Sequence, residues 1–362
     1  MKKQKLNLKH KNEISIVCFS ALGLFMSVFL LLIIPLQASE SFSHADIVRD
    51  SIIFDLHCDT VYRFYRLRSM KRFASKGLQV TLPRLKQAGV KAQFFAVWVP
   101  PKKGFKHANN LIDIFEKMID KNSDSMAFAG SYSALQHNLA EGKISAFLAI
   151  EGGKAIYTKI SRLAHFYNRG VRSMTLTWNF NNRIADASGS RKRRYGGLSP
   201  FGEQVVEKMN QLGMIIDVSH SADATVKDIL KITTDPVIAS HSCCYAHRRF
   251  HRNVKDELIE GICKSGGVIG VNFYSKHLTA KKYATASTVA DHIDHVVQIG
   301  GINCAAIGSD YDGMPRPAKG LENIGKLENL TNELIKRGYS KGDIEKIYGL
   351  NTIRVVKRVL DN

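Results

Sequence analysis

The chain has 362 residues and a formal net charge of +20 at pH 7, from 52 Lys and Arg against 32 Asp and Glu. Such an excess is typical either of a nucleic-acid-binding protein or of a solvated basic surface near anionic lipid or envelope polymer. Because no nucleic-acid-binding motif accompanies the charge, we expect no nucleic-acid partner. The length, less about 40 residues at the N-terminus, fits one barrel-sized domain and requires no second one.

The N-terminal segment has the pattern of an export signal. Residues 1–13 carry five lysines against one acid, and residues 14–36 contain no charge, with Leu36-Gln37-Ala38 as a candidate cleavage site. We therefore expect residues 1–40 to be a signal peptide and the protein to lie in the periplasm or on the extracellular face. The apolar run exceeds the usual signal-peptide core of roughly 7–15 residues, so an uncleaved anchor that associates with the membrane is the alternative.

Eight short apolar runs of β-type recur along the rest of the chain, and each one ends in polar residues. They are Ser51–Leu56, Ala92–Trp98, Ile144–Ile150, Val171–Thr177, Gly213–Val218, Pro236–Ser240, Gly267–Asn272 and Cys304–Ser309. Runs buried on both faces, each followed by a helical pattern, are typical of a parallel sheet with crossover helices. We predict an α/β fold, a single (β/α)₈ TIM-type barrel over residues 41–362, whose carboxyl-terminal strand ends share one mouth.

Helix signals support this alternation. Ser199 and Pro200 open a predicted helix that ends at Leu212, before Gly213. Ser287 or Thr288 is expected to cap a further helix. Two more are expected at the end of the chain: Ile344–Gly349, with Ser340 in a capping box, and Asn351–Leu360.

Two other features are less specific. The basic run Arg191–Arg194 lies in a Gly/Ser-rich stretch, which favours a mobile surface loop, with steering of anionic substrates as the alternative. Apart from Cys18 in the N-terminal segment, the chain has five cysteines, an odd number that leaves at least one thiol free within a single chain. We interpret Cys58 as a packing residue.

The strand ends carry metal-ligand chemistry. His57 and Asp59 are two residues apart on a strand, so both side chains point the same way. Imidazole and carboxylate groups are suitable ligands for Zn²⁺ and related ions. Four more such residues stand at strand ends: Glu151, His220, His241 and Asp310. The set suffices for two metals, with His57 and Asp59 on one, His220 and His241 on the other, and Glu151 between them.

The ordered motifs resemble the renal (membrane) dipeptidase family of the amidohydrolase superfamily. The resemblance rests on His57-Cys58-Asp59, Glu151-Gly152-Gly153, Thr175-Leu176-Thr177, Gly197–Gly202, Ile216–His220, Ser240-His241-Ser242, Arg252-Asn253-Val254 and Gly308–Gly313. It implies a zinc metallodipeptidase, often a homodimer, with two Zn²⁺ per subunit held by His57, Asp59, Glu151, His220 and His241. It further implies that Arg252 binds the terminal carboxylate of a dipeptide substrate and that Asp310 carries protons.

One position departs from the family pattern. The motif that begins Thr175-Leu176-Thr177 commonly ends in His, which contacts the scissile group, but here the next residue is Trp178. An indole N–H donates a hydrogen bond but carries neither a proton nor a charge through the reaction. Trp178 is thus either a weaker oxyanion donor or an aromatic pocket wall. Tyr274 is a further candidate for lining the pocket.

The predicted reaction is hydrolysis of the peptide bond of dipeptides by a hydroxide that bridges the two metals, with Asp310 and Glu151 as catalytic residues. Two alternatives remain. The same metals suit hydrolysis of another small amide or a lactam, and a non-catalytic binding protein would keep the scaffold without turnover.

Overall fold

The structure is a computed structural model that describes residues 41–70, 73, 77–100 and 102–361. Residues from Phe42 onward form one compact unit. The predicted export signal lies outside the described residues and stays a prediction. None of the helices in the described part is both long enough and apolar enough to span a bilayer.

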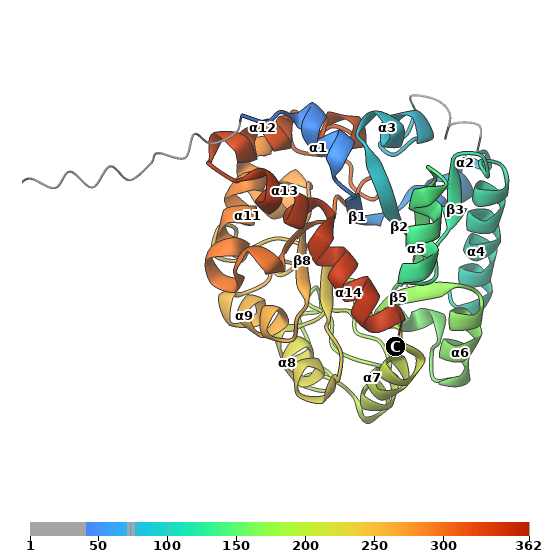
Figure 1. Ribbon diagram of the computed structural model, residues 1–362. Coiled ribbons are helices and arrows are strands. Elements are labelled where there is room, and N and C mark those ends of the chain that lie inside the picture. The colour runs from blue at the N-terminus through green and yellow to red at the C-terminus, as the bar shows by residue number, and fades with distance from the viewer. Residues whose placement is uncertain (1–40, 71–72, 74–76, 101, 362) are drawn as a thin grey trace, which may run out of the picture. The chain divides into compact units, whose positions relative to one another are not determined.

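Eight parallel strands form the barrel, as predicted (Figure 1). In spatial order they are β1 (Ile53–Cys58), β2 (Val90–Trp98), β4 (Ile144–Glu151), β5 (Val171–Thr175), β6 (Ile215–Asp217), β7 (Ile238–Ser242), β8 (Val268–Val271) and β9 (Ala305–Ile307). The last strand meets the first beyond its own end: Asp310 N donates to His57 O over 3.1 Å, and Asp59 N donates to Tyr311 O over 2.8 Å. The barrel therefore closes at its carboxyl-terminal mouth.

A ninth strand was not expected from the sequence. β3 (Met126–Phe128) pairs with the first half of β4 and lies off the barrel path. It has only three residues, one of them the exposed Phe128, and so gives no periodic signal. The predicted fifth strand is also shorter at both ends, as β6 covers Ile215–Asp217. It starts later than predicted because Gly213 adopts a left-handed conformation (φ 64°) as the C-cap of the preceding helix.

The helices surround the strands (Figure 1). They are α1 (His44–Asp50), α2 (Thr60–Leu67), α3 (Leu82–Gln87), α4 (Phe105–Asp120), α5 (Tyr132–Ala140), α6 (Ser161–Asn168), α7 (Pro200–Leu212), α8 (Asp223–Ile232), α9 (Asp256–Lys264), α10 (Ser275–Leu278), α11 (Ala286–Gly300), α12 (Glu328–Lys336), α13 (Lys341–Glu345) and α14 (Asn351–Leu360). A π-helical turn, Lys346–Leu350, joins the last two.

Most predicted helix ends are confirmed. The α7 N-cap is Ser199, whose hydroxyl accepts from Gly202 N, and Ser340 forms the expected capping box with Asp343. The predicted cap of α11 is wrong: the N-cap is Thr285, and Thr288 takes the third helical position of its capping box. In this box both positions carry a hydroxyl, and sequence alone does not tell which of several neighbouring hydroxyl residues is the N-cap.

The interior of the barrel is apolar near the N-terminal ends of its strands. The rings of Phe54, Phe94 and Phe147, from three adjacent strands, lie with centroids 5.1 to 5.5 Å apart. They belong to one buried cluster with apolar side chains of α14, including Val356 and Val359. α14 crosses in front of the strands in Figure 1 and closes this end of the barrel. The larger cluster packs between the strands and the other helices.

The structure also shows how the cysteines and the basic run Arg191–Arg194 are bonded. A disulfide joins Cys263, at the end of α9, to Cys304, just before β9. Cys58, Cys243 and Cys244 are buried free thiols, in accord with the odd count. The basic run Arg191–Arg194 is exposed, in accord with a surface loop, and its mobility stays a prediction. At the end of the run, Asp186 accepts hydrogen bonds from three successive backbone amides, those of residues 194–196.

Candidate active site

A β-bulge in β1 aims the first pair of candidate ligands at the mouth. Phe54 and Leu56 face the barrel interior, but the pairing of β1 with β2 shifts register between Asp55 and Cys58. Such a shift changes which alternate residues face inward. His57 and Asp59 consequently lie together, with 3.6 Å between His57 Nε2 and Asp59 Oδ2, while Cys58 packs in the larger apolar cluster, as expected.

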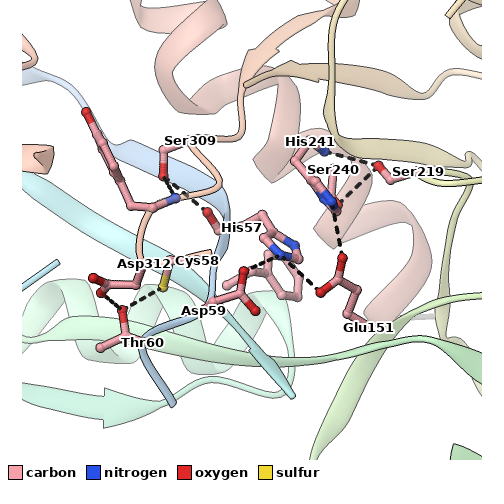
Figure 2. A network of polar contacts seen from close by, with 12 residues as sticks. His57, Cys58, Asp59, Thr60, Glu151, Ser219, Ser240, His241, Ser309 and Asp312 are labelled. Atoms are coloured by element: carbon pink, nitrogen blue, oxygen red, sulfur yellow. Dashed lines mark hydrogen bonds and ion pairs between the residues drawn. The ribbon is translucent and has the colours of Figure 1, made fainter. Parts of the chain in front are cut away.

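Glu151, the last residue of β4, lies between two groups of candidate ligands. Its Oε2 atom is 3.9 Å from Nε2 of His57, as Figure 2 shows. Its Oε1 atom is 2.8 Å from Nε2 of His220 and 3.4 Å from Nε2 of His241. The two oxygens of a single buried carboxylate therefore face two different sets of nitrogen atoms.

His220 and His241 present the same ring atom to the centre. Their Nε2 atoms lie 3.1 Å apart, and each Nδ1 has a partner elsewhere. Nδ1 of His220 is 3.0 Å from Asn179 Oδ1, and Nδ1 of His241 is 2.8 Å from Ser240 Oγ. The amide oxygen can only accept, so His220 Nδ1 carries the proton and leaves a lone pair on Nε2. A partner of this kind is what orients a ligating histidine toward a metal.

Two buried aspartates hold the strand ends in place. Asp217 of β6 accepts from Ser219 N, at 2.9 Å, and from both the amide N (3.0 Å) and the hydroxyl of Ser240. Asp55 of β1 accepts from Ser309 N at 2.7 Å and from its hydroxyl at 2.6 Å. Each aspartate thus ties its own strand to the neighbouring strand next to a candidate ligand.

The titratable groups of the cluster are buried, and burial acts against their charged forms. Burial raises the pKa of Glu151 well above its usual value, and the charge of Asp59 adds to the rise. Burial acts to lower the pKa of His57, but the carboxylates of Asp59 and Glu151 outweigh it and raise that pKa to about 10. For His220 and His241, burial lowers the pKa, which favours the neutral ring.

A divalent cation fits this arrangement. Nε2 of His57 is buried and has no hydrogen-bond partner among the described residues. Three ligand sets have all their donor atoms within 4.8 Å of one another: His57, Asp59 and Glu151; Glu151, His220 and His241; His57, His241 and Asp310. Neutral imidazoles and carboxylates at such spacing suit zinc and related ions.

The cluster forms the floor of a cavity of about 680 Å³ at the mouth of the barrel. Eight of the nine residues singled out from the sequence line it: Asp59, Glu151, Trp178, His220, His241, Arg252, Tyr274 and Asp310. The ninth, His57, contacts the lining residue Asp59. The structure therefore brings every predicted site residue to one place. Burial raises the pKa of Asp310 to about 7, with the charge of His57 opposing the rise.

Arg252 is buried at the side of this cavity. Its Nη2 atom donates to His241 O at 2.9 Å, whereas its Nε has no partner among the described residues. Burial lowers the pKa of Arg252, and the charge of Asp310 partly restores it. A buried guanidinium with an unused N–H that borders a cavity is suited to bind a carboxylate.

Trp178 and Tyr274 form aromatic parts of the cavity wall. The Trp178 ring is 5.0 Å from that of Trp98 and 6.1 Å from that of His220. The Tyr274 ring is 4.8 Å from that of His277. These contacts place both residues at the cavity, and hydrogen bonding by Trp178 to a reacting group stays a prediction.

Sequence reasoning assigned no role to four supporting residues: Asp55, Asp217, Asn179 and Gly313. The first three act through hydrogen bonds between strands, which no sequence spacing reveals. A Cβ on Gly313 would overlap Asp59 Oδ2 and lie 2.8 Å from Asp310 Oδ1, so only glycine lets these carboxylates approach. Backbone strain is a further sign, because His220 and Asp310 adopt left-handed φ values of 68° and 63°.

A parallel (β/α)₈ barrel with histidines and carboxylates clustered at its carboxyl-terminal mouth is typical of metal-dependent hydrolases. Comparison with known proteins narrows this class. The model of the membrane dipeptidase family, peptidase family M19, matches residues 43–362, and the chain belongs to this family of metallodipeptidases.

Individual relatives agree with this assignment. Dipeptidase aclJ of Aspergillus oryzae is 35% identical over 292 residues, which cover 77% of this chain and 69% of that protein. An amidohydrolase from Pseudomonas aeruginosa has a similar fold, with a TM-score of 0.78 at 24% identity, over 89% of this chain and 100% of the other. A metallopeptidase from Rhodobacter sphaeroides was solved with a phosphinate mimic of the dipeptide L-Ala-D-Ala. Its fold matches with a TM-score of 0.79 at 23% identity, over 86% of this chain and 100% of the other.

Proposed function

We propose that this protein hydrolyses the peptide bond of dipeptides with the help of two Zn²⁺ ions. His57 and Asp59 would hold one ion, His220 and His241 the other, and Glu151 would contribute one oxygen to each. The observation that carries the proposal is that Oε2 of Glu151 faces His57 while Oε1 faces His220 and His241. When bound, such a pair of ions supplies an activated water and polarises a carbonyl group.

Two residues of the chain would carry out the remaining steps, which are substrate binding and proton transfer. Arg252, fixed by its bond to His241 O, would bind the free carboxylate of the substrate through two parallel N–H groups and so set its register. Asp310 would take a proton from the attacking water and pass it to the leaving amine. Its backbone amide is anchored to His57 O, which keeps the carboxyl group beside the floor of the cavity.

The cavity and the relatives support the proposed substrate class. A volume of about 680 Å³ is in the range of small-molecule sites, and a buried arginine at its wall favours a ligand with a free carboxylate. The curated relative is named a dipeptidase, and the Rhodobacter sphaeroides structure holds a dipeptide mimic. Both support a dipeptide over a longer peptide.

The test combines metal analysis with a substrate panel. Purified protein should contain about two zinc ions per chain and hydrolyse dipeptides, but it should act poorly on the matching dipeptide amides, which lack the carboxylate. Arg252→Lys should weaken kcat/KM for dipeptides sharply, because an ammonium group cannot form two parallel bonds. Arg249→Lys, at an exposed position in the same loop, is the control and should change little.

Two outcomes would contradict the proposal. Equal turnover of acid and amide, or an equal effect of Arg252→Lys on both, would favour a general amide or lactam hydrolase. Protein with no bound metal after zinc loading, and with no turnover, would favour a binding protein on the same scaffold.

A further inference from the structure

The cavity above the proposed metal cluster is lined by cationic side chains that form no ion pair with an acid of the described residues. Four cationic side chains line it: Arg63, Arg66, Arg252 and Lys276. The ion pairs among the described lining residues join Glu151 to histidines, and none includes these four. Asp312 also lines the cavity, but its carboxylate already accepts from Thr60 Oγ1 at 2.7 Å and Gln79 N at 2.8 Å.

A hydrogen bond joins the two chain segments that carry Lys276 and Arg252. Asn253, next to Arg252 in the chain, donates from Nδ2 to the backbone oxygen of His277, next to Lys276, over 2.7 Å. The contact fixes the start of α10 against the loop that follows β7. The two cations therefore lie on the same side of the cavity, which is built by the neighbouring strands β7 and β8.

Aromatic contacts position the Lys276 ammonium group. Nζ lies 5.3 Å from the ring centroid of Phe250, and the Phe250 ring stacks on His277 with centroids 5.2 Å apart. A cation over an aromatic face is held without being neutralised. The exposed side chain thus has a preferred place at the rim and keeps its charge available.

The neighbouring histidines His277 and His251 add no charge of their own. Burial lowers the pKa of His277, and the charges of Arg252 and Lys276 lower it further. Burial and the charge of Arg252 likewise lower the pKa of His251. Both rings are accordingly neutral near pH 7, and this side of the cavity is positive through Arg252 and Lys276.

Other elements contribute a second aromatic part of the wall, next to α2, which carries Arg63 and Arg66. Trp98 and Trp178 line it from β2 and from the segment after β5, with Phe180 beside them, more than half exposed. A substrate whose carboxyl end is held by Arg252 would thus meet apolar surface at one end and a second cation at the other.

We propose that Lys276 determines specificity by binding the side-chain carboxylate of the substrate's C-terminal residue, so that the preferred substrates are dipeptides ending in Asp or Glu. This inference rests on the proposed dipeptidase function and on the carboxylate clamp at Arg252. The two carboxylates of such a residue are joined by only a few carbon–carbon bonds, and the flexible lysine stem lets the ammonium group of Lys276 reach into the cavity that Arg252 also lines.

The experiment compares acidic substrates with their uncharged isosteres. Wild-type protein should cleave Ala-Asp and Ala-Glu with a kcat/KM at least about tenfold above that for Ala-Asn and Ala-Gln, and added salt should reduce the difference. Lys276→Gln should abolish the preference, mainly through KM for the acidic substrates, and leave the amide-side-chain substrates unchanged. Lys282→Gln is the matched control, because Lys282 is exposed, contacts the Tyr283 ring at 5.6 Å and does not line the cavity.

Each other outcome has a distinct meaning. If no dipeptide is cleaved, the proposed function fails, whereas turnover of all four dipeptides without an acidic preference overturns this inference alone. An acidic preference that survives Lys276→Gln but disappears in Arg63→Gln or Arg66→Gln would place the second carboxylate at α2 and also overturn the role of Lys276.

Discussion

The two ends of the barrel use the same strands in opposite ways. Toward the N-terminal end, β4 contributes Phe147 to an apolar cluster that α14 closes. Four residues later, at the mouth, the same strand ends in Glu151, a buried carboxylate with its pKa raised by burial. The mouth also holds the left-handed residues His220 and Asp310. Stability is thus concentrated at one end, and strain and buried charge at the other.

The largest effect on activity is expected from Glu151→Ala. Loss of a carboxylate shared by both proposed metal sites should remove metal from both. The loss in kcat/KM should exceed the roughly 10- to 100-fold that follows when a residue that merely orients a ligand is removed. Metal analysis, kinetics and circular dichroism measure the three quantities, with Glu141→Ala as a surface control. A variant that keeps both metals and full activity would contradict the shared-ligand role.

Phe147→Ala, on the same strand as Glu151, should lower stability and leave turnover unchanged, the reverse of what is expected for Glu151→Ala. The side chain is fully buried between Phe54 and Phe94, so its removal leaves a cavity and should lower the free energy of unfolding by about 3–5 kcal/mol. The turnover of the molecules that stay folded should not change, because the ring lies away from the mouth. Denaturant unfolding and kcat, measured together, test this. A large fall in kcat with unchanged stability would mean that the two ends are not independent.

The contrast between the ends also explains how much the sequence could predict. Long apolar runs predicted the barrel, and the polar residues at their ends identified His57, Glu151 and His241 as candidate ligands. The pattern missed β3, because three residues carry no periodicity, and it misplaced the cap of α11 by two or three positions. It also gave no role to Asp217 and Asn179, which act on side chains of other strands and become visible only when the barrel brings those strands together.

Trp178→Phe tests whether the departure from the family motif affects chemistry. The substitution keeps an aromatic ring against Trp98 but deletes the indole N–H. If that group donates to the developing oxyanion, kcat and kcat/KM should fall together on the order of 100-fold. Steady-state kinetics with an acidic and a neutral dipeptide measure both constants. An unchanged kcat would leave Trp178 as a wall of the cavity alone.

The smallest of the four effects is expected from Asp217→Asn, which alters how His241 is held. In the structure the Ser240 hydroxyl donates to Asp217, so its oxygen is free to accept from Nδ1–H of His241 and leave a lone pair on Nε2. An amide nitrogen facing Ser240 would donate instead, and the serine hydroxyl would then turn toward Nδ1.

That reversal places the His241 proton on Nε2, the atom that faces Glu151. The variant should keep its fold but bind the ion of the His220–His241 site about 10- to 100-fold more weakly, in line with other residues that orient metal ligands. Activity should be low at limiting zinc and recover as zinc is raised, whereas Asp223→Asn, which breaks the surface ion pair with Lys255, should show no such dependence. Activity that stays low at all zinc concentrations with full metal occupancy would mean that Asp217 acts on the reaction by another route than the tautomer of His241.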